Sequence, residues 1–173
     1  VFYKHKRLTR YGKTIYVYKL RSMYWKYSTG DKGQKKSDEQ IFREMGREDL
    51  IAEFKKNQKV KDDPRIMKIG KFTRSTSLDE LPQLINIFKG DLSLVGPRPI
   101  VKDELHHYDE FDSLFLAIRP GLTGLWQVSG RSDLSYEERV RLDIYYIQNW
   151  SLILDIKILL KTVAVVIRKV GSH

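Results

Sequence analysis

The last long segment of the chain, residues 151–170, is apolar with helical periodicity, and it restricts the fold more than any other stretch. A helix that crosses a bilayer needs about 20 predominantly apolar residues. Lys157, Lys161, Arg168 and Lys169 interrupt this segment, which argues against a membrane-spanning helix. We expect an amphipathic helix in the membrane interface, although packing of one face against a protein core explains the sequence equally well.

The rest of the chain predicts an α+β fold, namely a mainly helical single domain with a small antiparallel β-hairpin near the N-terminus. With 173 residues and 41% hydrophobic content, the chain can bury one core, so residues 1–173 form one predicted domain. β-branched and aromatic residues mark strands at 1–8 and 14–23, and Tyr11-Gly12-Lys13 marks the turn between them. The sequence has no cysteine, which rules out disulfides and thiolate metal sites.

Helical periodicity predicts helices at residues 38–57, 101–115 and 136–150, the first of them broken near Gly46. Residues 28–37 have the composition of a linker. Residues 66–73 are predicted as a short connector and residues 119–124 as a loop.

Two adjacent carboxylates, Asp79 and Glu80, lie at the start of a further predicted helix that ends at Gly90. Ser77 and Glu80 have the spacing of a capping box, and Pro82 fits the first helical turn if Asp79 lies near the N-cap. The two carboxylates therefore either only cap this helix or form part of a site where a helix N-terminus receives phosphate.

Separate roles suit this pair better than a symmetric acid/base pair. Side chains of neighbouring helical residues point about 100° apart, so Asp79 and Glu80 do not face each other. One carboxylate can attack a phosphorus atom, while the other holds a divalent cation that neutralises a diphosphate.

Arginines supply the positive charge that such a reaction needs. Arg98 lies between two prolines, which restrict its backbone and can direct its guanidinium at phosphate oxygens. Arg74 and Arg131 are further candidate phosphate ligands. Asp143, among apolar neighbours in a predicted helix, either pairs with one of these arginines or is a second ligand of metal or substrate.

The net charge of +10 lies at the start of the chain. Residues 1–36 hold eleven lysines and arginines and one acidic residue, whereas the remaining residues carry equal numbers of each sign. A basic segment of this kind attracts polyanions, either nucleic acid or an anionic membrane surface. A solvated surface of long cationic side chains is the simpler explanation.

Four stretches carry a resemblance to a known family: residues 76–83 (TSLDELPQ), 89–99 (KGDLSLVGPRP), 119–131 (RPGLTGLWQVSGR) and 142–146 (LDIYY). In this order they closely resemble the bacterial sugar transferases, the monotopic polyprenol-phosphate phosphoglycosyl transferases. Residues 1–4 (VFYK) and 19–23 (KLRSM) are similar to the first soluble hairpin of that family. The family normally carries a hydrophobic membrane helix ahead of this hairpin, so we expect a piece that lacks this main anchor.

The resemblance implies an activity and roles for particular residues. Asp79 would attack a nucleotide-diphosphate sugar, with UMP as leaving group if the donor is a UDP-sugar, and polyprenol (undecaprenyl) phosphate would then accept the phosphosugar. Glu80 would bind Mg²⁺. The implied substrate- and phosphate-binding residues are Arg74, Arg98, Arg131, Asp143 and Lys19. This would be the first membrane step of glycoconjugate or exopolysaccharide synthesis, on the cytoplasmic face of the bacterial inner membrane, by a possible homo-oligomer.

Two other functions fit parts of the sequence. A nucleic-acid-binding module is compatible with the basic N-terminal block and its interleaved aromatic residues. However, the specific motifs lie in the electrically neutral remainder of the chain, so we expect no nucleic-acid partner. A membrane adaptor without catalysis would explain the basic and apolar segments but not the arginine-flanked carboxylates.

Overall fold

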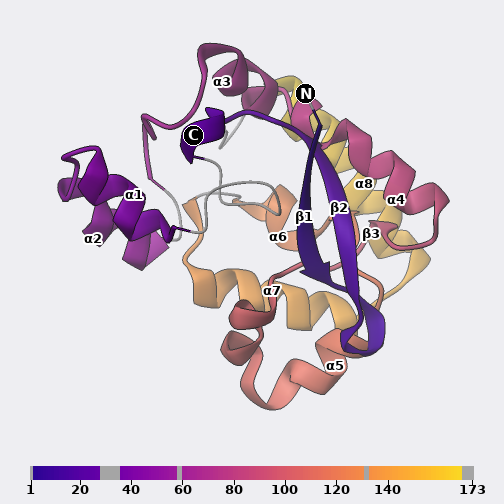
Figure 1. The fold of residues 1–173 in the computed structure, drawn as a ribbon. Coiled ribbons are helices and arrows are strands. Elements are labelled where there is room, and N and C mark those ends of the chain that lie inside the picture. The colour runs from indigo at the N-terminus through magenta and orange to yellow at the C-terminus, as the bar shows by residue number, and fades with distance from the viewer. Residues whose placement is uncertain (1, 28–35, 58–59, 131–132, 169–173) are drawn as a thin grey trace.

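The structure, a computed structural model, describes residues 2–27, 36–57, 60–130 and 133–168 (Figure 1). It confirms the predicted α+β class, because helices predominate and an antiparallel hairpin lies near the N-terminus. The hairpin consists of β1 (Phe2–Leu8) and β2 (Thr14–Leu20). Its turn contains Tyr11 and Gly12 at φ of 60° and 69°, so the predicted turn is confirmed, and the second strand ends earlier than expected.

Helices occupy most of the remaining chain. The α-helices of the described residues are α1 (Asp38–Glu44), α2 (Asp49–Asn57), α3 (Lys68–Ser75), α4 (Leu84–Phe88), α5 (Asp112–Ala117), α6 (Leu125–Ser129), α7 (Tyr136–Gln148) and α8 (Leu152–Arg168). Two 3₁₀ helices matter for the site, η3 (Leu78–Gln83) and η4 (Lys102–Phe111).

Most predicted helices are confirmed and one connector is wrong. α7 and α8 match the predictions, and α1 and α2 are separated at Gly46, whose φ is 67°. The segment 101–115 is a 3₁₀ helix followed by the short α5, because the backbone turns at Asp109 with φ of 43°. The connector predicted at 66–73 is instead largely the helix α3. Most of the predicted linker 28–37 falls outside the described residues.

The loop predicted at 119–124 contains a strand. β3 (Ser93–Val95) pairs in parallel with β4 (Gly121–Thr123), which forms a second two-stranded sheet. The two backbones approach so closely that a Cβ on Gly121 would lie 2.1 Å from the Gly96 nitrogen. This contact holds the start of the Gly-Pro-Arg-Pro turn, which follows β3 in the sequence, against the start of β4.

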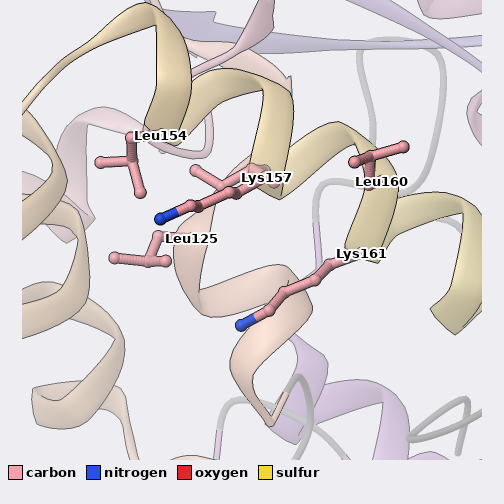
Figure 2. Close-up of a pocket in the computed structure, with 6 residues that line it drawn as sticks. Leu125, Leu154, Lys157, Leu160 and Lys161 are labelled. Atoms are coloured by element: carbon pink, nitrogen blue, oxygen red, sulfur yellow. The ribbon is translucent and has the colours of Figure 1, made fainter.

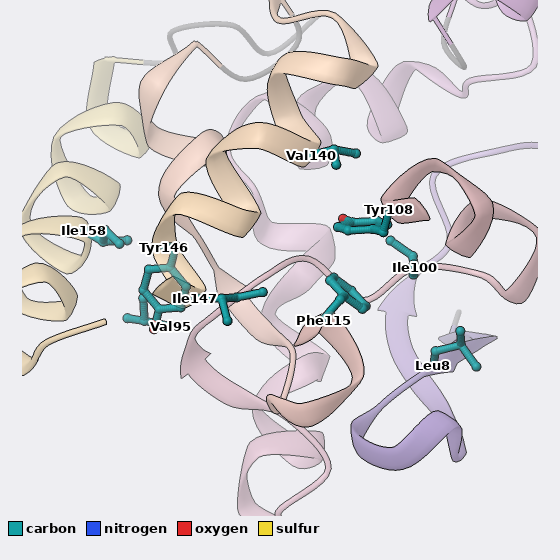
Figure 3. Close-up of a cluster of buried hydrophobic side chains, with 9 residues drawn as sticks. All are labelled: Leu8, Val95, Ile100, Tyr108, Phe115, Val140, Tyr146, Ile147 and Ile158. Carbon is teal, nitrogen blue, oxygen red and sulfur yellow. The ribbon is translucent and has the colours of Figure 1, made fainter. Parts of the chain in front are cut away.

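One main core holds these elements together (Figure 3). It joins the end of β1, strand β3, the η4–α5 region and the inner faces of α7 and α8. Its buried members are Leu8, Val95, Ile100, Tyr108, Phe115, Val140, Tyr146, Ile147 and Ile158. A smaller cluster of Phe42, Leu50 and Val60 lies under α1 and α2, which sit to one side of the domain in Figure 1.

Helix α8 packs one face on the domain, which is one of the two arrangements that its sequence predicted. Ile158 is 1% exposed, and the Thr162 hydroxyl lies 2.8 Å from that of Thr123 on β4, so one face packs on the domain. The other face leaves a continuous apolar stripe exposed: Leu152, Ile153, Ile156, Leu159, Leu160, Val163 and Ile167. Within the described ranges, every helix is too short or too polar to cross a membrane.

Candidate active site

The acidic pair reaches its place because η3 and α4 dock against strand β2. Asn86 on α4 is fully buried and hydrogen-bonds the edge of β2 as another strand would. Its Oδ1 accepts from the Tyr18 amide at 3.1 Å, and its Nδ2 donates to the Tyr16 carbonyl at 2.7 Å. These bonds satisfy backbone groups that would otherwise be buried without partners. They also bring the residues of η3 next to Lys19.

Glu80 pairs with Lys19 across this junction. The Lys19 Nζ donates to Glu80 Oε1 at 2.7 Å, and both side chains are partly exposed. The predicted capping box is therefore wrong. Ser77 lies in the left-handed region at φ of 56° and makes no side-chain cap, because a 3₁₀ helix begins here instead of an α-helix.

Asp79 lies in the first turn of η3 and is 8% exposed. Burial raises the pKa of its carboxyl group, and the charge of Lys19 opposes that rise, with a smaller opposing effect from Arg74. Glu80 adds to the rise. Asp79 is thus a desolvated carboxylate with two cations beside it, which is the condition of an activated anionic nucleophile.

Arg74 belongs to α3, which packs against the chain just after the hairpin. A Cβ on Gly70 would lie 2.0 Å from the Ser22 carbonyl oxygen, so only glycine permits this approach. The Arg74 Nε donates to the Ser22 hydroxyl at 2.8 Å. Burial lowers the pKa of Arg74, and the negative charge of Asp79 counteracts this, so the charges of Arg74 and Asp79 interact.

A second group of arginines lies next to this first one. The Leu8 amide donates to the Ile100 carbonyl at 2.8 Å, and this bond brings the end of β1 alongside the Pro-Arg-Pro turn. Burial, and then the charge of Arg98, lowers the pKa of Arg7 to about 10. The charge of Arg98 also acts on Arg74. Arg7, Arg98 and Arg139 of α7 are called the arginine cluster below.

Trp126 on α6 forms an aromatic surface for this cluster. The Arg98 guanidinium lies 5.7 Å from the centroid of the buried indole ring, and that of Arg139 lies 5.2 Å from it. The Arg139 Nε and Nη2 also donate to the Leu134 carbonyl. Burial, and then the charge of Arg98, lowers the pKa of Arg139. Crowded guanidinium groups of this kind favour binding of an anion.

Asp143 lies in the core beside the arginine cluster and is 1% exposed. The Tyr108 hydroxyl donates to its Oδ2 at 2.9 Å, while its buried Oδ1 has no hydrogen-bond partner among the described residues. Burial raises the pKa of Asp143 to about 8, although the hydrogen bond from Tyr108 and the charge of Arg98 oppose the rise. Burial therefore favours the neutral carboxylic acid form of Asp143, and this weakens its pairing with the arginine cluster.

The structure gathers the predicted residues into two adjoining groups. Asp79, Glu80, Arg74 and Lys19 form the first, and Arg98 with Asp143 belongs to the second. Arg131 lies outside the described residues. Arg7, Arg139, Tyr108 and Trp126 were not predicted from the sequence. Glu104 on η4 was not predicted either, and its negative charge opposes the lowering of the pKa of Arg7 and Arg139. One signal was available for Arg139, which precedes Asp143 by four residues and therefore shares its helix face.

The described residues contain no group of three or more histidine, aspartate or glutamate side chains placed to hold a metal ion. Magnesium is commonly bound by one or two carboxylates together with substrate phosphates and water. Glu80, beside Asp79 and partly exposed, fits that manner of binding, with Lys19 on one of its oxygens.

This fold and site define an α+β domain in which a buried aspartate and a partly exposed glutamate lie near a group of arginines. The chain belongs to the bacterial sugar transferase family, whose model matches residues 1–169. It is 48% identical over 173 residues to an undecaprenyl-phosphate galactose phosphotransferase of Salmonella typhimurium, covering 99% of this chain and 34% of that protein.

Two further relatives show the range of the family. The exopolysaccharide production protein ExoY of Sinorhizobium fredii is 43% identical over 175 residues, covering all of this chain and 73% of ExoY. A UDP-glucose:undecaprenyl-phosphate glucose-1-phosphate transferase of Klebsiella pneumoniae is 36% identical over 174 residues, covering 94% of this chain and 32% of that protein. The chain thus spans about a third of the Salmonella and Klebsiella relatives.

Proposed function

We propose that this chain transfers a phosphosugar from a UDP-sugar to a polyprenol phosphate, through a covalent intermediate on Asp79. The observation that carries the proposal is the buried Asp79 carboxyl group, on which the charges of Lys19 and Arg74 act, next to Glu80, which accepts a hydrogen bond from Lys19. The names of the Salmonella and Klebsiella relatives support the lipid acceptor, and the Klebsiella name supports a UDP-sugar donor.

The first step would form an acyl phosphate. A carboxylate oxygen of Asp79 attacks the phosphorus that bears the sugar, and the bond from that phosphorus to the bridging oxygen breaks. UMP leaves with the electron pair. The buried carboxylate can act in this way because Lys19 and Arg74 favour its ionised form against the effect of burial.

The second step would regenerate the enzyme. An oxygen of the polyprenol phosphate attacks the same phosphorus, and Asp79 leaves as a carboxylate. The arginine cluster would hold the phosphates of donor and acceptor, because guanidinium groups bind phosphate oxygens in pairs. Glu80 would hold Mg²⁺, which would neutralise the charge of the diphosphate.

We further propose that the domain works on a membrane surface, at the cytoplasmic face of the bacterial inner membrane. The exposed stripe of α8 and a second apolar surface on α3, η3 and α4 would contact lipid. Phe88 on α4 is 90% exposed. The second surface consists of Ile69, Phe72, Leu78, Leu81, Leu84, Ile85 and Phe88.

Intact-mass spectrometry with a panel of UDP-sugars tests the nucleophile. We expect the wild-type protein to gain the mass of one phosphosugar and to release UMP, and Asp79→Asn to lose this adduct with an unchanged circular dichroism spectrum. Asp103→Asn, the same chemical change at an exposed position, should keep the adduct. An adduct that survives in Asp79→Asn would assign the nucleophile elsewhere. The panel also identifies the sugar.

A further inference from the structure

A groove lies between α6 and α8 (Figure 2). None of the residues that line it belongs to the acidic pair or the arginine cluster. Its volume is about 310 Å³. The residues that line it are Leu125, Leu154, Lys157, Ile158, Leu160 and Lys161. An apolar groove with two cations fits a ligand that has both an apolar chain and an anionic group.

The two lysines are placed to share one anion. They are four residues apart on α8 and therefore lie on the same side of the helix. Figure 2 shows both ammonium groups pointing to the side of α8 on which α6 lies. Both side chains are exposed, and no carboxylate of the described residues lies within ion-pair distance of either. A phosphate between them would therefore replace water and not an existing partner.

The apolar stripe of α8 borders the groove. Leu160 belongs to both, being 68% exposed and one of the groove-lining residues. If the stripe enters the apolar part of a membrane, the lysines lie at its edge, at the level of the lipid headgroups. An acyl chain can then pass from the bilayer along Leu160 into the groove.

We propose that the α6–α8 groove binds one anionic phospholipid, with its phosphate between Lys157 and Lys161 and an acyl chain against Leu154, Ile158 and Leu160. This proposal rests on the membrane contact of the proposed function. A membrane phospholipid is favoured over the polyprenol phosphate acceptor, because an acceptor phosphate must reach Asp79. The charges that act on Asp79 are those of Lys19, Glu80 and Arg74, and neither Lys157 nor Lys161 is among them.

Native mass spectrometry from detergent micelles tests the site, with phosphatidylglycerol as the anionic probe and phosphatidylcholine as the neutral one. We expect one phosphatidylglycerol to be retained in preference to phosphatidylcholine. The double variant Lys157→Gln/Lys161→Gln should bind phosphatidylglycerol about 30-fold more weakly. Lys61→Gln/Lys102→Gln removes the same charge from exposed positions outside the groove and should bind like wild type.

A second pair of variants separates the groove from the general membrane surface. Leu160→Asn and Leu152→Asn change side chains of nearly equal exposure on α8, 68% and 67%, but only Leu160 lines the groove. We expect Leu160→Asn to lose the retained lipid and Leu152→Asn to keep it. Equal retention in all these variants would overturn the proposal, and so would displacement of phosphatidylglycerol by an equimolar polyprenol phosphate.

Measuring the phosphosugar adduct on Asp79 in the same variants separates the test of the groove from the test of the proposed function. The groove variants should form the adduct in detergent at the wild-type rate, because Asp79 is unchanged in them. Loss of lipid with normal adduct supports the groove. If wild-type protein forms no adduct but retains the lipid, the proposed reaction fails and the groove stands.

Discussion

Arg65 and Arg98 both lie against an aromatic ring, yet opposite charge surroundings give them different uses. Arg65 lies 4.3 Å from the Phe42 centroid, and Arg98 lies 5.7 Å from that of Trp126. Arg65 is 3% exposed and makes a bidentate ion pair with Asp63, with an Nη2–Oδ2 distance of 2.7 Å, and a further hydrogen bond to Asp38. Burial alone would lower the pKa of Arg65, but these carboxylates raise it above its ordinary value.

Arg98 has no such carboxylate among the described residues. Instead its charge lowers the pKa of Arg7, Arg74 and Arg139. A buried arginine with matched carboxylates stabilises the fold, whereas arginines that lower each other's pKa favour binding of an anion, although the charge of Glu104 partly offsets this at Arg7 and Arg139.

The largest expected effect is on stability, at the matched site. Arg65→Met leaves the buried Asp63 carboxylate without its partner, so we expect the free energy of unfolding to fall by about 3–5 kcal/mol. Urea unfolding followed by circular dichroism measures this. Arg47→Met, which breaks the exposed pair with Asp49, is the control and should give no measurable loss. If both variants lost the same free energy of unfolding, the buried ion pair of Arg65 would contribute no more to stability than the exposed pair of Arg47.

Arg98→Met should have the opposite pattern. Removing one crowded guanidinium relieves repulsion, so the free energy of unfolding should stay constant or rise. Affinity for UDP, measured by titration calorimetry, should fall by about 10-fold to 100-fold, because a charged hydrogen bond to phosphate is lost. A stability loss as large as that of Arg65→Met would show that Arg98 is a structural residue.

A smaller effect concerns Asp143 and pH. Its pKa is raised to about 8 in the folded protein, far above the value of about 3.9 expected in an unfolded chain. The folded state therefore holds a proton that the unfolded state releases, and stability falls as pH rises from about 4 to about 8. In Asp143→Asn the amide oxygen can still accept the hydrogen bond from Tyr108, but the side chain does not titrate. The variant therefore avoids the loss of stability at high pH, and its free energy of unfolding at pH 8 should exceed that of wild type by at least about 1 kcal/mol.

Unfolding in urea at pH 5 and pH 8 checks this prediction. The gain of Asp143→Asn over wild type should be larger at pH 8 than at pH 5. A gain that is the same at both values would mean that Asp143 is already ionised in the folded protein, and the arginine cluster would then have its matching carboxylate after all.

The sequence predicted helices well where apolar periodicity was strong and caps were local. α7 begins at the Ser135–Glu138 capping box, and α1 at the box of Ser37 and Gln40, so their starts depend on residues three positions apart. α3 was missed although it is amphipathic, because its polar and apolar residues alternate over only two turns. The capping box predicted at Ser77 does not form, because the Glu80 side chain instead pairs with Lys19, which lies 61 residues away in the sequence.

By itself, the sequence determined the family, the hairpin, the main helices and the one-sided character of α8, because these depend on motifs and periodicities within short stretches. Only the tertiary structure decided which charges meet. Asn86 seats η3 on β2, Gly70 lets α3 approach Ser22, and the Leu8–Ile100 bond brings Arg7 to Arg98. Partners so distant in sequence are set by backbone docking and burial. Burial also raises the pKa of both Asp79 and Asp143, and nearby cations oppose that rise.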